Sequence, residues 1–236
     1  MKIAIIPARG GSQRIKNKNI ADFLGKPMIA YALEAAKNSG LFEKIHVSTD
    51  SDLVVSVTEK LGYKVDFKRP QELADNHTGI VPVLKWVIER YAQNGLKFED
   101  VCCIMPAAPL LEPQDLQEAY EIYKKHGKRL PLLAAAELPV PVEWVFRKDE
   151  NEVLTPVMPD ALQVRSQDLQ KAYYESGPFS YFHVSYLLGN DEEKKVKFLS
   201  YVIPPERAVD IDDPEDIKLA KTLCLGKLAL KKIATT

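Results

Sequence analysis

The amino-acid sequence predicts an α/β protein built on a doubly wound, mostly parallel sheet. Over the first half of the chain, short apolar runs of strand length alternate with amphipathic segments of helical length. The run 101–105 is continuously apolar, which is typical of a strand buried on both faces of a parallel sheet. A chain of 236 residues fits one domain with a substantial core, so we expect residues 1–236 to form a single domain.

Local signals place the elements in order along the chain. A first strand at 3–6 is followed by a helix at 28–38, which Pro27 opens and Gly40 ends. The remaining strands are expected at 45–48, 63–67, 101–105, 132–136, 178–183 and 198–203. The remaining helices are expected at 52–61, 81–91, 115–125 and 214–228, the last with Pro214 in its first turn.

The alternation of strands and helices fails between about residues 138 and 176. This stretch holds Pro139, Pro141, Pro156 and Pro159, and it has no long amphipathic helix. It offers only two short β-like runs, at 142–146 and 152–154. Insertions of this kind reach out of a domain, either as a lid or as an arm that packs on another subunit.

Composition limits the partners. The formal net charge is −1, so no nucleic-acid partner is expected. No apolar run approaches the ~20 residues of a membrane-spanning helix, and no membrane partner is expected. Three cysteines, two of them adjacent at Cys102 and Cys103, give neither a disulfide framework nor metal-ligand spacing. This cysteine usage predicts a cytoplasmic protein.

The loop at 7–19 follows the first strand directly and concentrates basic residues. Arg9, Arg14, Lys16 and Lys18 all precede the first acidic residue of the chain, Asp22. Glycines at 10 and 11 allow backbone N–H groups to approach an anion closely. The loop matches neither the Walker pattern nor the Rossmann glycine triplet, so a solvated basic turn is the alternative. Its place after a strand favours an anion site, because ligands bind beyond the carboxyl ends of strands in open α/β sheets.

A second candidate site feature is an acidic segment near the end of the chain. Asp210 and Asp212 alternate in an extended segment, so their carboxylates point to the same side. Two such carboxylates near phosphates suit Mg²⁺, which prefers hard oxygen ligands. The alternative is that Asp213 caps the following helix and the other two are solvated.

Together these motifs resemble those of a known family. The motifs are Ile-Ile-Pro-Ala-Arg-Gly-Gly-Ser at 5–12, Lys18-Asn19-Ile20, Gly25-Lys26-Pro27, Val47-Ser48-Thr49-Asp50, Arg69-Pro70 and Asp210-Ile211-Asp212. In order and spacing they are similar to the sugar-acid cytidylyltransferases, the CMP-sialic acid synthetase family, from residue 3 to about residue 220. The resemblance implies a Rossmann-like nucleotidyltransferase fold, Mg²⁺, and a homodimer formed by the 138–176 arm. It also implies the reaction of CTP with a nonulosonic acid to give a CMP-sugar and pyrophosphate.

Within that family the chain looks most like the enzymes that act on pseudaminic acid. Sialic acid members typically carry Gln-Pro-Thr-Ser-Pro-Leu-Arg where residues 105–111 read Met-Pro-Ala-Ala-Pro-Leu-Leu. They carry Arg-Pro-Asn-Gly where residues 174–177 read Tyr-Glu-Ser-Gly. The legionaminic, N-acetylneuraminic and Kdo acids remain alternative substrates. One departure lies in the first loop, where Gln13 replaces the usual Lys. Either Arg14 and Lys16 supply that charge, or the Lys is dispensable in this chain.

The resemblance also implies roles for individual residues. The expected catalytic residues are Arg9, Lys18, Asp210 and Asp212. The expected nucleotide-binding residues are Ala8, Arg9, Gly10, Gly11, Ser12, Lys18, Asn19 and Arg69. The expected sugar-binding residues are Gln163, Arg165, Gln167 and Tyr173. Asp210 and Asp212 are the expected Mg²⁺ ligands, and Asp210 is also a candidate general base.

Several of these residues have a plainer interpretation. Arg69 fits a salt bridge with a nearby acid, Ser12 a simple turn, and Arg165 a surface or interface residue. His77 is expected to be neither ligand nor catalyst. Trp86 lies on an apolar helical face and is expected in the core, whereas Trp144 suits a dimer contact.

Two functions of other kinds compete with this interpretation. A catalytically silent nucleotide-binding regulator would be free to lose Arg9, Lys18, Asp210 and Asp212, yet all four are present. A GT-A-like glycosyltransferase would carry an Asp-x-Asp metal motif in mid-chain. The nearest match is Asp50-Ser51-Asp52, where Asp52 is better explained as the start of a helix.

Overall fold

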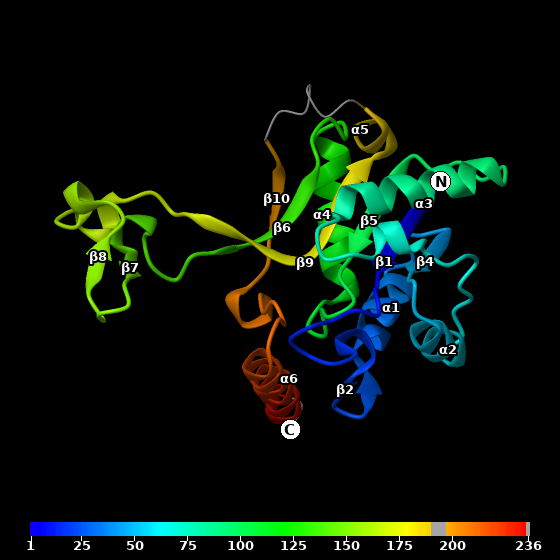
Figure 1. The fold of residues 1–236 in the computed structure, drawn as a ribbon. Helices are drawn as coiled ribbons and strands as arrows, with labels where there is room; N and C mark the ends of the chain where they lie inside the picture. The colour runs from blue at the N-terminus through cyan, green and yellow to red at the C-terminus, as the bar shows by residue number, and fades with distance from the viewer. Residues whose placement is uncertain (190–196, 235–236) are drawn as a thin grey trace.

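A six-stranded sheet in the order β10-β6-β9-β5-β1-β4 forms the centre of the protein in this computed structural model, which describes residues 1–189 and 197–234 (Figure 1). The strands are β1 (Lys2–Pro7), β4 (Lys44–Ser48), β5 (Asp100–Ile104), β6 (Leu132–Glu137), β9 (Tyr173–His183) and β10 (Leu199–Val202). Strand β9 runs antiparallel to β5 and β6, and the other pairings are parallel. The predicted mostly parallel sheet is confirmed.

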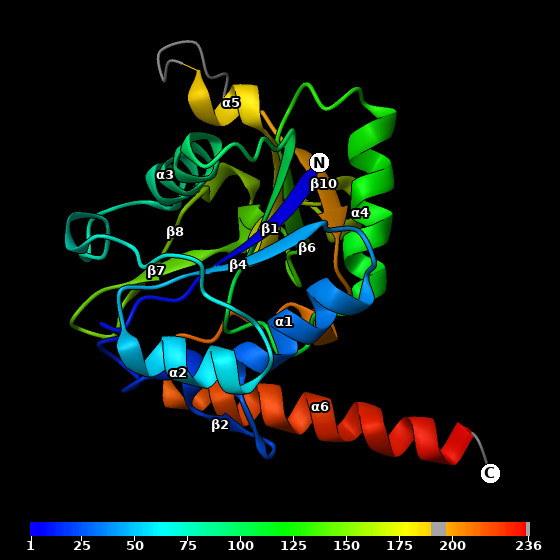
Figure 2. The ribbon, with the colours of Figure 1, turned by 90° about the vertical axis from the view of Figure 1, so that its right-hand side faces the viewer.

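Helices cover both faces of the sheet, as the doubly wound prediction requires. They are α1 (Met28–Asn38), α2 (Asp52–Lys60), α3 (Ile80–Gln93), α4 (Pro113–Lys125), α5 (Val184–Leu188) and α6 (Pro214–Ala234). Helices α3 and α4 lie on opposite sides of the sheet (Figure 2). Short 3₁₀ turns lie at Lys18–Ile20, Gln71–Leu73, Val142–Trp144, Pro159–Ala161, Ser166–Asp168 and Pro205–Arg207. Within the described residues, no helix is long and apolar enough to cross a membrane.

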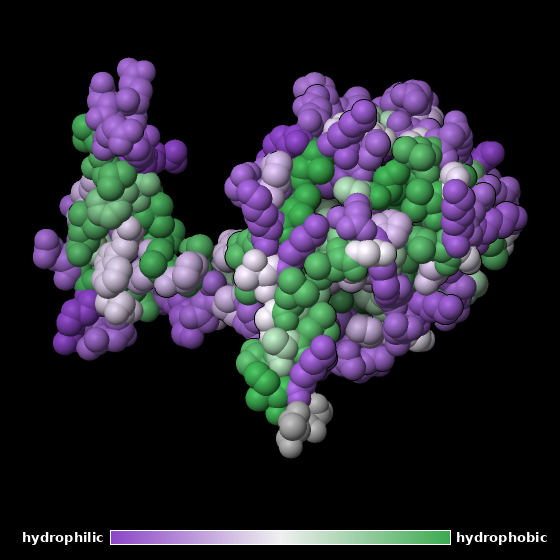
Figure 3. Space-filling view, turned by 90° about the horizontal axis from the view of Figure 1, so that it is seen from below, coloured by the Kyte–Doolittle hydropathy of each residue, from purple (hydrophilic) through white to green (hydrophobic). Residues whose placement is uncertain are grey.

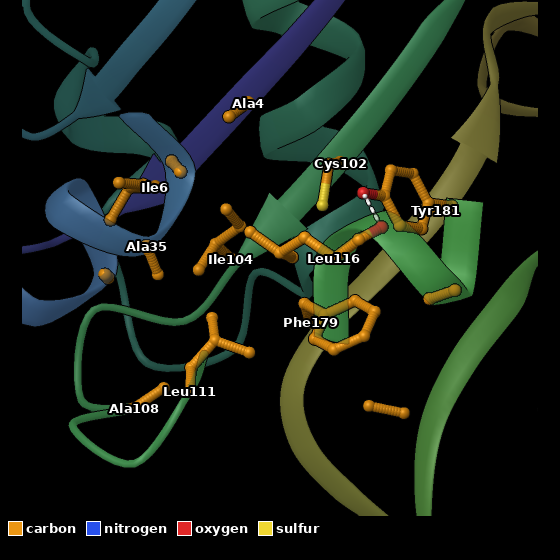
Figure 4. Close-up of a cluster of buried hydrophobic side chains, with 14 of the residues drawn as sticks. Ala4, Ile6, Ala35, Cys102, Ile104, Ala108, Leu111, Leu116, Phe179 and Tyr181 are labelled. Carbon is orange, nitrogen blue, oxygen red and sulfur yellow. Dashed lines mark hydrogen bonds between the residues drawn. The ribbon is translucent and has the colours of Figure 1, made fainter. Parts of the chain in front are cut away.

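The alternation of side chains along β1 divides the core between the two faces. Ala4 and Ile6 point to the face covered by α1 and α4, whereas Ile3 and Ile5 point to the face covered by α3 and α5. On the first face, Tyr181 of β9 donates a hydrogen bond from its hydroxyl to the Leu116 backbone oxygen, at 2.9 Å (Figure 4). All five of these side chains are buried, so β1 is a rigid base for the loop that follows it.

One predicted strand is absent, and the arm contains less strand than predicted. Residues 63–67 form no strand: Tyr63 and Val65 pack on one core cluster and Phe67 on the other, without pairing with β4. The side chains of this segment alternate between partly buried and exposed, as in a strand, but its backbone forms no strand pairing. Trp86 packs against Phe67 at the edge of the core, as predicted.

The predicted arm projects away from the body (Figure 1), and Figure 3 shows hydrophobic residues on its surface. It carries a small hairpin of β7 (Phe146–Lys148) and β8 (Leu154–Pro156). The predicted β-like run at 142–146 is a 3₁₀ turn up to Trp144, and strand begins only at Phe146. The arm also ends earlier than predicted, because β9 already begins at Tyr173. A second small hairpin pairs β2 (Asp22–Phe23) with β3 (Lys26–Pro27) just before α1.

Candidate functional site

A cavity of about 290 Å³ lies beyond the carboxyl ends of β1 and β5. Three segments of the chain line it. They are the loop after β1, the segment after β5, and the acidic segment before α6: Pro7, Arg9, Ser12, Gln13, Arg14, Ile15, Lys18 and Asn19; Met105, Pro106 and Ala107; Asp210 and Asp212. The fold therefore brings together the basic loop and the acidic pair, which are about 190 positions apart in the sequence.

The loop after β1 is held to the neighbouring strand by its backbone. The Ala8 N–H donates to the Ser48 backbone oxygen at 2.9 Å, and the Asn19 side-chain amide donates to the Arg9 backbone oxygen at 2.9 Å. The Gly10 N–H donates to Oδ1 of Asp50 at 2.9 Å, so this donor already has a protein acceptor. Sterically, Gly10 is needed because a Cβ there would lie 2.8 Å from the Ser51 Cβ.

Gly11 differs from Gly10 in its surroundings. An added Cβ at Gly11 would meet no atom within 4 Å, so the space beside it is open. Ser12 lines the cavity one residue later. Of the loop residues predicted to bind the nucleotide, Arg9, Ser12, Lys18 and Asn19 line the cavity, whereas Ala8, Gly10 and Gly11 do not.

Ion pairs join the basic loop to the acidic segment. The Asp212 carboxylate lies 2.8 Å from Nη2 of Arg14 and 3.2 Å from Nζ of Lys18. Lys18 also donates to the Ile211 backbone oxygen at 2.6 Å. Ile211 is fully buried, which anchors the segment between the two aspartates. Arg14 thus brings a positive charge to the cavity. This fits the hypothesis that Arg14 replaces the Lys that family members usually carry where this chain has Gln13.

The start of α6 fixes the other end of the acidic segment. Oδ2 of Asp216 accepts from the backbone N–H groups of Asp212 and Asp213, both at 2.8 Å. Oδ1 of Asp213 accepts in return from the Asp216 N–H at 3.0 Å. The predicted cap at Asp213 is confirmed, and it coexists with the cavity position of Asp212.

The two aspartates of the cavity have different electrostatic surroundings. Burial and the neighbouring Asp212 carboxylate raise the pKa of Asp210. Burial also opposes ionisation of Asp212, but hydrogen bonds from Lys18 and Arg14 outweigh it, and the pKa of Asp212 is lowered. Within the described part of the chain, no group hydrogen-bonds to the Asp210 carboxylate. Asp210 is therefore the carboxylate with the most to gain from a bound cation.

The surroundings of Asp210 leave room for such a cation. Gly177 faces this carboxylate, and an added Cβ would lie 3.9 Å from it. The φ of Gly177 is +76°, a left-handed conformation that glycine adopts without strain. Among residues 1–189 and 197–234, no group of three or more His, Cys, Asp or Glu side chains gathers to hold a metal. Two carboxylates fit Mg²⁺ nonetheless, because Mg²⁺ on nucleotides takes its other ligands from phosphates and water.

Arg9 lines the cavity and is held by a loop that sequence reasoning missed. Its Nη1 donates to the Asp75 backbone oxygen and to Oδ1 of Asn76, both at 2.6 Å. The Asp75 carboxylate accepts from the N–H groups of His77 and Thr78, which closes the loop on itself. The Asp-x-x-Thr spacing was the signal for this turn. His77 serves the turn through its backbone, and its side chain is exposed.

Arg69 lies behind the cavity and does not line it. The side chain is buried, and its nitrogens donate to the Ser48 hydroxyl at 3.1 Å, the Ser48 backbone oxygen at 2.7 Å and the Leu73 backbone oxygen at 3.4 Å. The alternative interpretation expected a salt bridge between Arg69 and an acidic side chain. The hydrogen-bond acceptors of Arg69 are instead these neutral oxygens. Arg69 thus braces the end of β4, and its contact with a nucleotide stays a prediction.

The predicted sugar-binding residues do not line the cavity of their own chain. Gln163, Arg165 and Gln167 are exposed on the arm, and Tyr173 is exposed at the start of β9. Arg165 pairs with Asp168 at 2.8 Å. Their role toward a sugar stays a prediction.

A partly buried ionic network anchors the acidic segment from behind, and no local sequence pattern indicated it. Arg207 pairs with Asp115 and lies 3.1 Å from Glu112, both at the start of α4. The Tyr201 hydroxyl donates to Asp115 at 2.9 Å, and Lys227 of α6 pairs with Glu112. The acidic segment thus begins three residues after a fixed arginine.

Comparison with known proteins agrees with this geometry. Residues 3–233 match the family described as Cytidylyltransferase. The chain belongs to the cytidylyltransferase family. This cytidylyltransferase is 37% identical over 221 residues to the pseudaminic acid cytidylyltransferase of Campylobacter jejuni serotype O:23/36, covering 94% of this chain and 95% of the relative.

The chain is also similar to a second curated relative and to a solved structure. The first is with a Helicobacter pylori protein named pseudaminic acid cytidylyltransferase and UDP-2,4-diacetamido-2,4,6-trideoxy-beta-L-altropyranose hydrolase. The cytidylyltransferase is 35% identical to it over 186 residues, covering 74% of this chain and 33% of the relative. The second is with the structure of CMP:2-keto-3-deoxy-manno-octonic acid synthetase complexed with CTP, which matches with a TM-score of 0.71 and 14% identity, covering 96% and 99% of the two chains. The structural match confirms the predicted nucleotidyltransferase fold.

Proposed function

We propose that this cytidylyltransferase joins CTP to pseudaminic acid, giving the CMP-sugar and pyrophosphate. The observation that carries the proposal is the meeting of Arg9, Lys18, Asp210 and Asp212 at one cavity. A basic loop at a strand end suits a triphosphate, and an adjacent carboxylate pair suits the metal that accompanies it. The similarity to pseudaminic acid cytidylyltransferases supports the choice of sugar.

The proposed reaction is a single displacement at phosphorus. The anomeric hydroxyl oxygen of the sugar bonds to the α-phosphorus of CTP, the bond from that phosphorus to the bridging oxygen breaks, and pyrophosphate leaves. The hydroxyl proton passes to a base, for which Asp210 is the candidate because its carboxylate lines the cavity and accepts no hydrogen bond from the described residues. Catalysis of this kind depends mainly on positioning and on neutralising phosphate charge.

Lys18 and Arg14 are the cations best placed to exchange partners when CTP binds. In this structure both contact Asp212, and both line the cavity. A triphosphate would compete with Asp212 for them and release its carboxylate. Arg9, held by Asp75 and Asn76, is already oriented into the cavity and need not move.

We propose Mg²⁺ as the cofactor, held by Asp210 and Asp212 together with phosphate oxygens. When bound, it would neutralise phosphate charge and lower the pKa of the attacking hydroxyl. The raised pKa of Asp210 supports this assignment, because two close carboxylates without a cation repel each other. Titration of the protein with Mg²⁺ and CTP by calorimetry tests it against the Asp210→Asn variant.

We also propose a cytoplasmic homodimer formed through the arm. Phe146 and Leu154 are 44% and 58% exposed on the hairpin, far more than apolar residues of the body's core. A partner chain would cover them, and it would offer Gln163, Arg165 and Gln167 a cavity that their own chain does not present. Three free cysteines fit a reducing cytoplasm.

The test of the proposed function is pyrophosphate release with CTP, Mg²⁺ and a panel of nonulosonic acids. We expect turnover to be fastest with pseudaminic acid, and slower with legionaminic, N-acetylneuraminic and Kdo acids. No pyrophosphate with any sugar acid would refute the proposal. Preference for legionaminic acid would keep the reaction class and change the substrate.

A further inference from the structure

The cavity has one charged wall and one apolar wall. Arg9, Arg14, Lys18, Asp210 and Asp212 supply the charge. The segment 105–107, which reads Met-Pro-Ala, supplies no polar side-chain atom. A site that handled only a triphosphate, a metal and polyhydroxylated carbons would have little use for such a surface.

Met105 is the main contributor to the apolar wall. It follows β5, in which all five residues are buried, yet Met105 itself is 40% exposed and lines the cavity. Its position is fixed, because its N–H donates to the Pro178 backbone oxygen at 2.9 Å. A large apolar side chain that lines a polar cavity offers a contact surface for an apolar part of a ligand.

The wall begins beside the proposed reaction centre. Met105 and Asp210 line the same cavity, and Pro178 next to Met105 follows Gly177, which faces the Asp210 carboxylate. The sugar must approach the α-phosphorus near the metal ligands, so its ring substituents would lie against this wall. A hydroxyl placed there would lose water and find no partner, whereas a methyl group would bury apolar surface.

The chemistry of this wall therefore fits a sugar acid with methyl groups in place of hydroxyls. Acetamido groups and terminal deoxy carbons both offer them. Sialic acid members of the family typically place Gln at position 105 and Thr at position 107, which are hydrogen-bonding side chains. The chain has Met105 and Ala107 instead.

We propose that Met105 and Ala107 set sugar specificity by accepting deoxy, N-acylated substituents and disfavouring hydroxylated ones. This inference rests on the proposed function and deepens it. Met105 would contact the sugar without taking part in the chemistry, so its effect belongs in the discrimination between sugars. The nucleotide side of the reaction should not depend on it.

The test compares Met105→Gln with Met105→Leu, which keeps the apolar surface and nearly the same volume. For each protein, kcat/KM is measured for pseudaminic acid and N-acetylneuraminic acid, and KM is measured for CTP. We expect Met105→Gln to lower the ratio of the two kcat/KM values, pseudaminic over N-acetylneuraminic, by roughly 10-fold or more. Met105→Leu should keep it within about 3-fold, and the KM for CTP should not change. Ala107→Thr is a second variant and should shift the ratio in the same direction.

The possible failures are distinct. An unchanged ratio in both Met105→Gln and Ala107→Thr, with an active parent protein, overturns the specificity inference and leaves the proposed function standing. A higher KM for CTP with both sugars overturns it too, since the wall then faces the nucleoside. A parent protein that uses no nonulosonic acid overturns the inference together with the proposed function.

Discussion

The cavity of the body and the hairpin of the arm differ in how their side chains are held. Contacts within the chain hold those around the cavity, whereas the apolar side chains of the hairpin are largely exposed. Around the cavity, a buried Ile211 anchors the acidic segment, and ion pairs hold Asp212 to Arg14 and Lys18. In the arm, two three-residue strands carry Phe146 and Leu154 largely exposed. The cavity is built within one chain, whereas the arm presents apolar surface outward.

The difference divides the proposed reaction between two kinds of surface. The charged residues proposed to hold the triphosphate and the metal line one cavity of one chain. The predicted sugar-binding residues of the arm do not line that cavity, and Met105 is the residue there that we propose to contact the sugar. The comparison predicts that changes in the cavity act on the whole reaction, while changes in the arm act on association and on the sugar.

The largest effect is expected from Asp212→Ala. This change removes a proposed metal ligand and the acceptor of Lys18 and Arg14, so turnover should fall roughly 1,000-fold. Pyrophosphate release measures it, and circular dichroism checks the fold. Glu215→Ala, a carboxylate in the first turn of α6 outside the cavity, is the control and should keep full activity. Normal turnover in a folded Asp212→Ala protein would remove Asp212 from the site.

A smaller loss is expected from Lys18→Met. Lys18 lines the cavity, and its charge is proposed to neutralise the triphosphate, so kcat/KM for CTP should fall roughly 100-fold. Lys16→Met, an exposed lysine of the same loop that does not line the cavity, should change kcat/KM by less than about 2-fold. Equal effects of the two changes would show that the loop supplies only general positive charge.

A smaller effect on the reaction is expected from changes in the arm. Phe146 and Leu154 lie on the same face of the hairpin, so Phe146→Asp with Leu154→Asp should convert a dimer to a monomer of 26.6 kDa. Light scattering measures the mass. The KM for the sugar should rise about 10-fold while CTP affinity holds, since a fixed contact is worth about that much. Thr155→Asp, on the other face of β8, should leave the mass unchanged, and a monomeric parent protein would contradict the arm's proposed role.

The smallest effect concerns stability and has opposite signs at the two aspartates. The pKa of Asp210 is raised above 3.8, so its ionised form destabilises the fold fully above the raised value, and the penalty fades as the pH falls through that value toward 3.8. Asp210→Asn should therefore raise Tm at pH 7, with less gain at pH 4. The pKa of Asp212 is lowered, so its ionised form stabilises the fold above 3.8 and this is lost in acid.

Asp212→Asn should accordingly lower Tm at pH 7. Scanning calorimetry without added metal measures both variants, and each serves as the other's control. Shifts of the same sign would show that the two carboxylates share one environment and would contradict the assigned ion pairs.

Local sequence patterns predicted most of the secondary structure and two of the segments that line the cavity. The order of helices and strands followed from periodicity and from Gly and Pro punctuation, and the basic loop and the Asp210–Asp212 segment were visible as charges at expected strand and helix ends. The prediction of a strand at 63–67 was wrong. Partly buried side chains such as Tyr63 and Phe67 alternate there with exposed ones, but the segment pairs with no other strand of the described structure.

Contacts between distant segments were beyond such patterns. The burial of Arg69 against Ser48 and Leu73, the Arg207–Asp115 pair, and the hold of Asp75 and Asn76 on Arg9 depend on tertiary packing. For the same reason the exposure of Met105 at the cavity could not be read from an apolar run that looked uniformly buried.

The central claim is that the cavity transfers the cytidylyl group of CTP to pseudaminic acid. Phosphorus-31 NMR of the purified protein with CTP, Mg²⁺ and pseudaminic acid tests it most directly. We expect the triphosphate signals to decay while a phosphodiester signal and pyrophosphate grow in equal amounts. Decay of CTP to pyrophosphate and free CMP, or unchanged CTP in the presence of the sugar, would contradict the claim.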